Sequence, residues 1–384
     1  MSYSSEFFPK ELLQKPISER LQYFKDRQID HAIQRNTFNR AITSLCCAAG
    51  AQVMVITGPT GVGKTTLARR LYRELQLRHL SDATADRSMV PVIGVNAAPP
   101  TGTSFNWKDF FARVLDRNGD ILLNKKITLR GQGDMFSDVI LQPEEGSSAD
   151  VLRRSLEKCI KLRKTRYLII DEAHHILMVK EPDRLEYQFE MLKSLTIEAD
   201  ITIVLIGTYD LLDIRDYSGQ LVRRSEILPM GRYDPNLVEG RMEFASTMEA
   251  LLLRMPLKTK PELANHMEYF FTKSAGCIGI LKDWLIRVYA HALEMGLDTF
   301  DQAFADRFAL DNKGLRTIIE EAINGEIKMT DEPYENISKL LLEGHGSSNR
   351  SPAAITPQQK MSSQKSTRVG TRRPKRDPVG DQHA

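Results

Sequence analysis

The stretch VMVITGPTGVGKTT, from Val53 to Thr66, decides how the rest of the chain is interpreted. Its first five residues are apolar or β-branched and predict a buried strand, and a glycine-rich loop follows directly. The loop GPTGVGKT, Gly58 to Thr65, fits the pattern G-x-x-x-x-G-K-[ST] without a mismatch, and an amphipathic helix begins behind it. A strand, this loop and a helix in succession are the context that identifies a phosphate-binding P-loop.

This loop is expected to bind ATP and Mg²⁺. Its glycines let the backbone N–H groups point at phosphate oxygens, Lys64 would neutralise the β- and γ-phosphates, and the Thr65 hydroxyl would bind Mg²⁺. The expected nucleotide-binding residues are Gly58, Pro59, Thr60, Gly61, Val62, Gly63, Lys64, Thr65 and Thr66.

A second stretch, YLIIDEAHHIL from Tyr167 to Leu177, supplies two carboxylates. An apolar strand that ends in acidic residues could simply be meeting solvent. Beside a P-loop, however, Asp171 fits the distant carboxylate that completes the Mg²⁺ shell. Glu172 then fits the general base that polarises the attacking water, so the pair favours an ATPase over a protein that binds nucleotide without cleaving it.

Strands and helices alternate through the first half of the chain. Strands are predicted at Val53–Thr57, Val90–Asn96, Tyr167–Asp171, Ile201–Gly207 and Glu226–Met230. Helices are predicted at Thr65–Gln76, Trp107–Arg117, Ala149–Arg163 and Leu185–Ala199. This alternation predicts an α/β fold with a five-stranded parallel sheet covered on both faces.

The pattern changes to helices alone after Asp234 and predicts a small helical lid that ends at a stop signal, Asn324-Gly325. Between the second and third strands, Gly119–Ser148 is expected to form a loop or hairpin insertion. The predicted domains are an N-terminal helical segment (1–48), an ATPase core (49–234), the lid (235–324), a helical extension (325–345) and a tail (346–384).

Two further motifs follow the acidic pair. ITIVLIGTYDLL predicts a strand that ends at Gly207-Thr208, where the Thr208 side chain could orient the attacking water. SGQLVRRSEI places Arg223 and Arg224 before the fifth strand, from where an arginine could reach the phosphate bound by a neighbouring subunit and stabilise its developing charge. Taken alone, Gly207-Thr208 would be interpreted as a turn that caps a strand, and Arg223-Arg224 as a solvated basic pair at a helix end; the order of the motifs favours the functional roles.

The order of these motifs and their amino-acid sequences resemble those of the AAA+ ATPases that regulate transposition, the TnsC, TniB and MuB group, and most closely those of TnsC. The resemblance covers about Arg27 to Tyr289 and rests on GPTGVGKTT, LIIDEAHHI, VLIGTYDLL and SGQLVRRSEI. It implies an AAA+ core with a helical lid. It also implies assembly on duplex DNA as a ring or helical filament, with about six or seven subunits per turn. It further implies recruitment of a transposase to a target chosen with a target-recognition protein.

The chain departs from this group at one expected site. Many AAA+ proteins carry a sensor arginine early in a lid helix, where this chain has Gly279, with Lys282 and Arg287 further on. Lys282 is the candidate for that role. Contacts to DNA phosphates in the group lie between the second and third strands, and the candidates here are Lys108, Lys125, Lys126 and Arg130.

Bulk properties are those of a soluble globular protein, with 41% hydrophobic and 27% charged residues, and they predict a cytoplasmic location without a membrane span. The four cysteines show neither zinc-ligand nor disulfide spacing, and no further ligand is expected near His174-His175. The tail from Gly346 carries eight Lys or Arg and two Asp, a net charge of +6, and its composition predicts disorder.

The sequence therefore predicts an ATP- and Mg²⁺-dependent, DNA-binding regulator of transposition targets. Two rivals remain open: an AAA+ ATPase of a secretion system, and an ATP-binding switch that assembles without hydrolysis.

Overall fold

The computed structural model describes residues 7–47, 52–100, 102, 104–119, 149–178, 183–217 and 223–343. The described chain divides into two compact units, Met1–Thr330 and Asp331–Ala384. The first contains the sheet and nearly all helices, and the described helix of the second is α15, Tyr334–Glu343. None of the described helices is long and apolar enough to cross a membrane.

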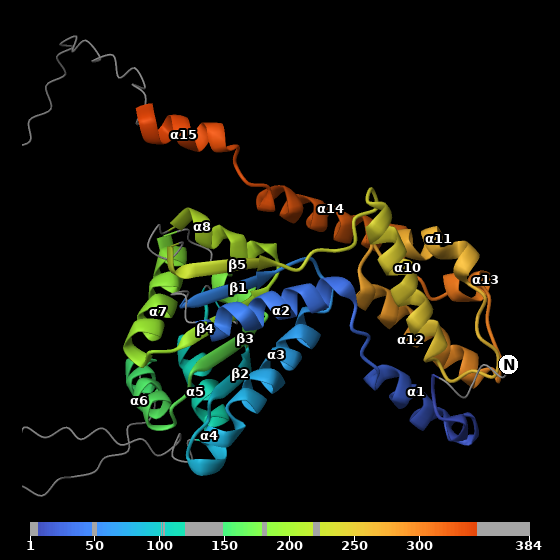
Figure 1. Cartoon of the computed structure of the whole chain (residues 1–384), viewed down its shortest axis with the longest axis horizontal. Coiled ribbons are helices and arrows are strands. Elements are labelled where there is room, and N and C mark those ends of the chain that lie inside the picture. Colours follow the sequence, from blue (N-terminus) through green and yellow to red (C-terminus); the bar gives the residue numbers. More distant parts are fainter. Residues whose placement is uncertain are drawn as a thin grey trace, which may run out of the picture. The chain divides into compact units, whose positions relative to one another are not determined.

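The first unit is built around a five-stranded sheet with the strand order β2-β3-β4-β1-β5, in which every described pairing is parallel (Figure 1). The strands are β1 Val53–Thr57, β2 Val92–Asn96, β3 Tyr167–Asp171, β4 Thr202–Gly207 and β5 Ser225–Pro229. The predicted α/β class and five-stranded parallel sheet are confirmed, with strand ends within two residues of their predicted positions. Since β4 lies between β1 and β3, the P-loop strand and the acidic strand are separated by the strand that ends at Thr208.

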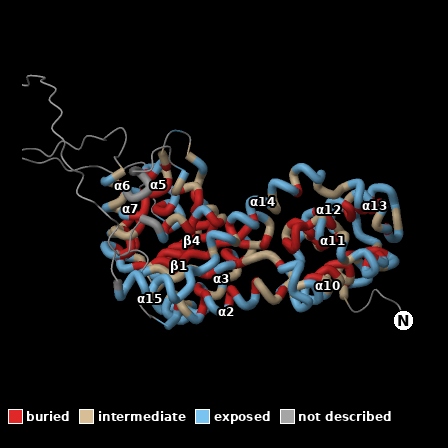
Figure 2. The backbone as a smooth tube through the Cα atoms, turned by 90° about the horizontal axis from the view of Figure 1, so that it is seen from above, coloured by how far each residue is buried: buried red, intermediate tan, exposed pale blue. Residues whose placement is uncertain are grey.

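Alternating side chains of each strand enter two different hydrophobic cores, as the two-residue period of a strand requires. Val53 and Val55 of β1 face the core formed with α5, α6 and α7, whereas Met54 and Ile56 face the core formed with α2 and α3. Figure 2 shows the central strands β1 and β4 buried, whereas β5 at the sheet edge is mostly half-buried. The helices of these cores are α2 Ala32–Cys46, α3 Lys64–Arg78, α5 Trp107–Arg117, α6 Ala149–Leu162 and α7 Asp183–Ala199.

Helices alone follow β5, as predicted, and they share a third hydrophobic core with α1. Trp284 and Tyr289 are among its fully buried side chains, and Phe24 of α1 packs edge-on against Tyr289 with ring centroids 5.4 Å apart. The N-terminal helix α1 therefore belongs to the lid's core. The helices of this core and its surroundings are α1 Ile17–Asp26, α10 Val238–Leu253, α11 Met267–Lys273, α12 Ile278–Glu294, α13 Gln302–Asp306 and α14 Asn312–Met329.

The remaining helical elements are short connections. They are η1 Lys10–Gln14, α4 Leu80–Ala85, η3 Ala173–Leu177, η4 Tyr209–Asp213, α8 Ile214–Tyr217 and η5 Ala264–His266, where η denotes a 3₁₀ helix. The predicted insertion lies outside the described residues except for Gly119, and the predicted basic tail lies outside them entirely.

The predicted helix stop at Asn324-Gly325 is wrong, because α14 continues through both residues to Met329. Gly325 is buried in the middle of the helix, and a Cβ at this position would lie 1.9 Å from Cδ2 of Tyr209. The glycine therefore allows α14 to approach η4 closely and does not end the helix. The other predicted domain boundaries remain predictions.

Candidate functional site

The P-loop connects β1 to α3 at the carboxyl edge of the sheet, where open parallel sheets bind their ligands. Gly61 and Gly63 adopt left-handed conformations with φ of +82° and +98°, which explains the need for glycine at both positions. Gly58 is close to the backbone that leaves β5, since a Cβ there would lie 2.0 Å from the Met230 carbonyl oxygen. The loop is therefore held between its own helix and the end of β5.

Lys64 opens α3, and its side chain is buried beneath the loop. Its ammonium group donates hydrogen bonds to the carbonyl oxygens of Gly58, at 2.9 Å, and Pro59, at 2.8 Å. Burial lowers the pKa of Lys64, and the nearby carboxylates of Glu172 and Asp171 oppose this shift. A buried cation surrounded by loop carbonyls is suited to exchange those partners for phosphate oxygens.

Thr65 and Asp171 meet across the sheet edge, although they lie 106 positions apart in the chain. The Thr65 side chain lies at the same end of one groove as the Asp171 carboxylate, which is only 6% exposed. Burial raises the pKa of Asp171, whereas the Thr65 side chain and the hydrogen bond from the Glu172 backbone N–H, at 2.9 Å, lower it. A hydroxyl and a carboxylate are oxygen ligands of the kind that Mg²⁺ prefers, so these residues fit the implied metal.

Glu172 follows β3 in a left-handed conformation with φ of +55°, which turns the chain into η3. Its side chain is 44% exposed, and one carboxylate oxygen lies 3.5 Å from Nδ1 of the buried His174. That nitrogen has no hydrogen-bond partner among the described residues, and burial lowers the pKa of His174. Glu172 is thus more accessible to water than the neighbouring Asp171, as a general base requires.

The expectation that no further metal-ligating group lies near His174-His175 is wrong, because Glu172 joins them with its ligand atoms within 4.8 Å of theirs. The cause is the tight 3₁₀ turn of η3, which completes a turn in three residues and gathers side chains that a strand would separate.

Thr208 follows β4, between the two strands that carry the other motifs. Its carbonyl oxygen accepts a hydrogen bond from the Thr57 hydroxyl at 2.7 Å, which holds this backbone against β1. Its own hydroxyl donates to Asp210 at 2.9 Å. The sheet therefore brings Thr208 to the same edge as the P-loop and the acidic pair.

Arg223 and Arg224 lie at the opposite edge of the sheet and are exposed. Arg224 donates to the side chain of Gln52 at 3.2 Å, and its carbonyl oxygen accepts from the Gln52 N–H at 2.9 Å. Gln52 precedes β1, so a five-residue strand, about 16 Å at 3.3 Å per residue, separates these arginines from the P-loop that follows β1. Neither arginine is brought to the phosphate site of its own chain.

Of the predicted DNA contacts, Lys108 is exposed on the first turn of α5. Lys125, Lys126 and Arg130 lie outside the described residues. Lys282, the candidate lid sensor, donates to the carbonyl oxygens of Lys25, at 2.8 Å, and Arg27, at 2.7 Å. Its contacts thus connect α12 to the C-terminal end of α1.

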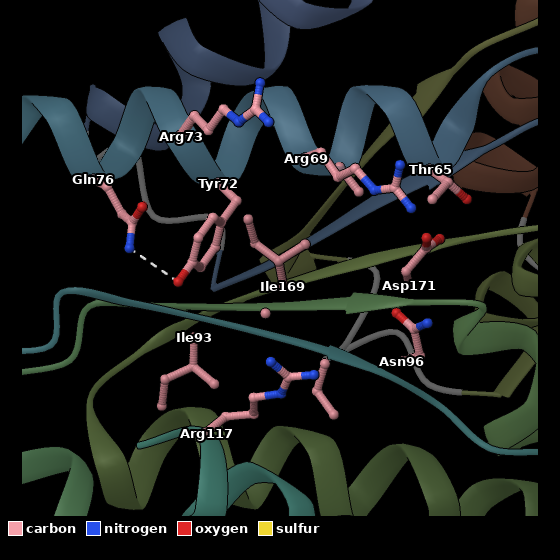
Figure 3. Close-up of a pocket in the computed structure, with 13 residues that line it drawn as sticks. Thr65, Arg69, Tyr72, Arg73, Gln76, Ile93, Asn96, Arg117, Ile169 and Asp171 are labelled. Carbon is pink, nitrogen blue, oxygen red and sulfur yellow. Dashed lines mark hydrogen bonds between the residues drawn. The ribbon is translucent and has the colours of Figure 1, made fainter. Parts of the chain in front are cut away.

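Sequence reasoning missed an arginine-lined groove of about 600 Å³ beside the acidic site. Figure 3 shows Thr65 and Asp171 at one end, with Arg69 and Arg73 on α3 along the wall. Among the described residues neither arginine forms an ion pair. Their spacing of four residues, which places them on one helix face, was the available signal.

Sequence reasoning also missed a half-buried ion pair between Arg232 and Glu326. The Arg232 guanidinium donates from Nε to Oε1 at 2.7 Å and from Nη2 to Oε2 at 3.0 Å. No local pattern could have indicated this pair, because its members lie 94 residues apart.

Comparisons with known proteins agree with this geometry. Residues 48–214 match the family described as "AAA domain" and form an AAA-family P-loop ATPase domain. No curated protein matches the chain.

Solved structures that are similar to the chain include the following three. The Aeropyrum pernix ORC2 protein has a TM-score of 0.50 at 15% identity, covering 83% of this chain and 88% of that one. A Walker-type ATPase of Pyrococcus abyssi has a TM-score of 0.45 at 16% identity (80% and 79% covered). Domain III of the Thermotoga maritima replication initiation protein DnaA has a TM-score of 0.38 at 13% identity (79% and 97% covered). At 15% identity the likeness to the Aeropyrum pernix protein concerns the fold alone, and the fold is that of an AAA+ P-loop ATPase.

Proposed function

We propose that this chain hydrolyses ATP with Mg²⁺, assembles on double-stranded DNA and regulates the choice of a transposition target by recruiting a transposase. The observation that carries the catalytic part is the position of Thr65 and Asp171 at one end of the same groove, with the accessible Glu172 directly after Asp171. This arrangement supplies oxygen ligands for a divalent cation and an adjacent general base at one sheet edge.

The chain's own groups divide the reaction between them. Lys64 exchanges the carbonyls of Gly58 and Pro59 for phosphate oxygens. Thr65 and Asp171 would hold Mg²⁺, which would offset the charge of the phosphates. Glu172 accepts a proton from the attacking water, and Thr208 orients that water. Arg224, or its neighbour Arg223, stabilises the developing charge at the site of an adjacent subunit.

An arginine pair that is exposed at the edge away from its own P-loop supports assembly, because it can act only where two subunits meet. The DNA-binding and transposition parts rest on the resemblance of the motifs to the TnsC, TniB and MuB group. Lys108, Lys125, Lys126 and Arg130 are the proposed phosphate contacts. Each would add a small, sequence-independent contribution that repetition around an assembly multiplies. A cytoplasmic location belongs to the same proposal.

The test is ATP turnover by the full chain with and without duplex DNA, combined with imaging of the protein on plasmid DNA in ATP. We expect DNA to increase turnover and ATP to produce rings or filaments on the duplex. Assembly without turnover would indicate the non-hydrolysing switch. If the turnover rate is the same with and without DNA, and no assembly forms on the duplex, an ATPase of a secretion system would be favoured.

A further inference from the structure

The first turn of the lid helix α12 packs directly on the P-loop. The backbone N–H of Gly279 donates to the carbonyl oxygen of Gly61 at 2.7 Å. A Cβ on Gly279 would lie 2.3 Å from that same oxygen, so this position accepts glycine alone in this arrangement. Because Lys282 is bonded to the carbonyls of Lys25 and Arg27, neither residue supplies a cation to the phosphates.

A different cation, Arg232, lies near the start of α12, because the adjacent Tyr233 donates its backbone N–H to the carbonyl oxygen of Gly276 at 3.1 Å. It follows β5 by three residues, on the segment that leads toward the lid. Two residues earlier, Met230 donates its N–H to the carbonyl of Thr57 at 2.8 Å and places its own carbonyl against Gly58. These two contacts hold the backbone of this segment beside the first residue of the loop.

The positive charges of Arg232 and Lys64 both act on the thiol of Cys277. Cys277 precedes α12 and is fully buried. Burial raises the pKa of its thiol to about 12, and the positive charges of Arg232 and Lys64 both oppose that shift. Since Tyr233 bonds to Gly276 and Gly279 bonds to Gly61, the segment that carries Arg232 and the P-loop both contact the chain at the start of α12.

The carboxylate that holds Arg232 comes from α14. Both oxygens of Glu326 accept from the guanidinium, and the Arg232 side chain is only 13% exposed while that of Glu326 is 38% exposed. The preceding residue, Gly325, packs on Tyr209, which directly follows Thr208. The ion pair between Arg232 and Glu326 therefore joins the segment after β5, which lies beside the P-loop, to α14, which packs on η4 directly after Thr208.

We infer that Arg232 is a second cationic ligand of the terminal phosphate of ATP, and that Glu326 holds its guanidinium when that phosphate is absent. The planar guanidinium forms the same pair of hydrogen bonds with a phosphate as with a carboxylate, so the exchange needs no new geometry at the arginine. This inference rests on the proposed function, in which the P-loop binds ATP. It assigns to Arg232 the discrimination between ATP, which has the terminal phosphate, and ADP, which lacks it.

The experiment measures the dissociation constants of ATP and of ADP in the full chain that carries Glu172→Gln, so that hydrolysis does not disturb binding. Arg232→Gln should reduce the preference for ATP over ADP about tenfold, the size expected for a charge-assisted hydrogen bond. Glu326→Gln should raise the preference several-fold, because Arg232 no longer has to leave a carboxylate. Lys328→Gln is the matched control, because Lys328 lies on the same helix as Glu326 and its change breaks a 3.0 Å ion pair with Asp213 of η4.

The two variants separate a phosphate ligand from a structural bridge. A bridge that only stabilises the fold would be broken equally by Arg232→Gln and Glu326→Gln, so equal changes in the same direction, or an unchanged preference in Arg232→Gln, would overturn the inference. Should Arg232→Gln fail to fold, Arg232→Lys keeps a cation for Glu326 without the planar fork and should lower the preference instead. Absence of turnover in the unmodified chain would contradict the proposed ATPase but leave this ratio measurable.

Discussion

The two edges of the same sheet carry cations of opposite character. At the carboxyl edge, Lys64 is buried and its ammonium is bonded to loop carbonyls, with Asp171 nearby and also buried. At the amino edge, Arg223 and Arg224 are exposed, and the described contact of the Arg224 guanidinium is a single bond to Gln52. Burial of an ionisable group is costly unless it has partners, so the first edge is a site built within one chain. The second edge offers free charges to another molecule.

Lys64→Ala should disrupt the buried site at the carboxyl edge of the sheet, and it should have the largest effect on ATP binding and turnover. The phosphates lose their main counter-charge, so ATP binding should weaken on the order of 100-fold, and turnover should disappear. Equilibrium binding of a fluorescent ATP analogue checks this. Lys158→Ala removes an exposed lysine from α6 and serves as control. Wild-type affinity in Lys64→Ala would contradict the assignment of the loop.

Arg224→Ala tests whether the exposed edge completes the ATP site of an adjacent subunit. Alone it should lose about 1000-fold in turnover, since a trans-acting arginine contributes at least that much in related phosphoryl transfers. Its P-loop is intact, so mixing it with an excess of Lys64→Ala, which retains both arginines, should restore part of the turnover. ATPase assays across mixing ratios measure this restoration, and Arg223→Ala is assayed in parallel. If mixing restores turnover to neither variant, the pair is structural.

Glu172→Gln should separate binding from hydrolysis at the carboxyl edge. An amide cannot accept the proton of the attacking water, so turnover should fall about 100-fold or more, while ATP binding persists. Phosphate release and nucleotide binding are measured on the same sample, with Glu198→Gln, an exposed carboxylate of α7, as control. Hydrolysis at the wild-type rate would show that another group is the base.

Gly325→Ala should have the smallest effect and concerns what supports the carboxyl edge. Alanine normally stabilises a helix relative to glycine, but here its Cβ would overlap Tyr209, and overpacking should cost about 1–3 kcal/mol. Thermal unfolding measures the loss. Gly314→Ala in the same helix approaches only the side-chain oxygen of Asp311, at 3.0 Å, and should leave the melting temperature nearly unchanged. Equal melting temperatures for both variants would mean that α14 does not pack on η4 in solution.

The sequence by itself was sufficient for the fold class, the five strands, and the P-loop with its acidic partner strand. These features have local causes: a buried strand requires an apolar run, and a phosphate loop requires glycines at fixed spacing before a helix. The roles predicted for Lys64, Asp171, Glu172 and Thr208 also follow from motif order. The fold then explains why they can cooperate, because β1, β4 and β3 are neighbours whose carboxyl ends meet.

Tertiary structure alone decided the features that depend on close approach between distant segments. From the sequence, Gly325 is interpreted as a helix stop, whereas in the structure it allows Tyr209 to pack against α14. Gly279 is interpreted as a missing sensor arginine, whereas in the structure it contacts Gly61 of the P-loop. The pairing of Arg232 with Glu326 joins residues from either end of the lid. Periodicity and spacing report what a segment does with its own neighbours in the chain, whereas these contacts depend on how whole helices pack, which no local pattern encodes.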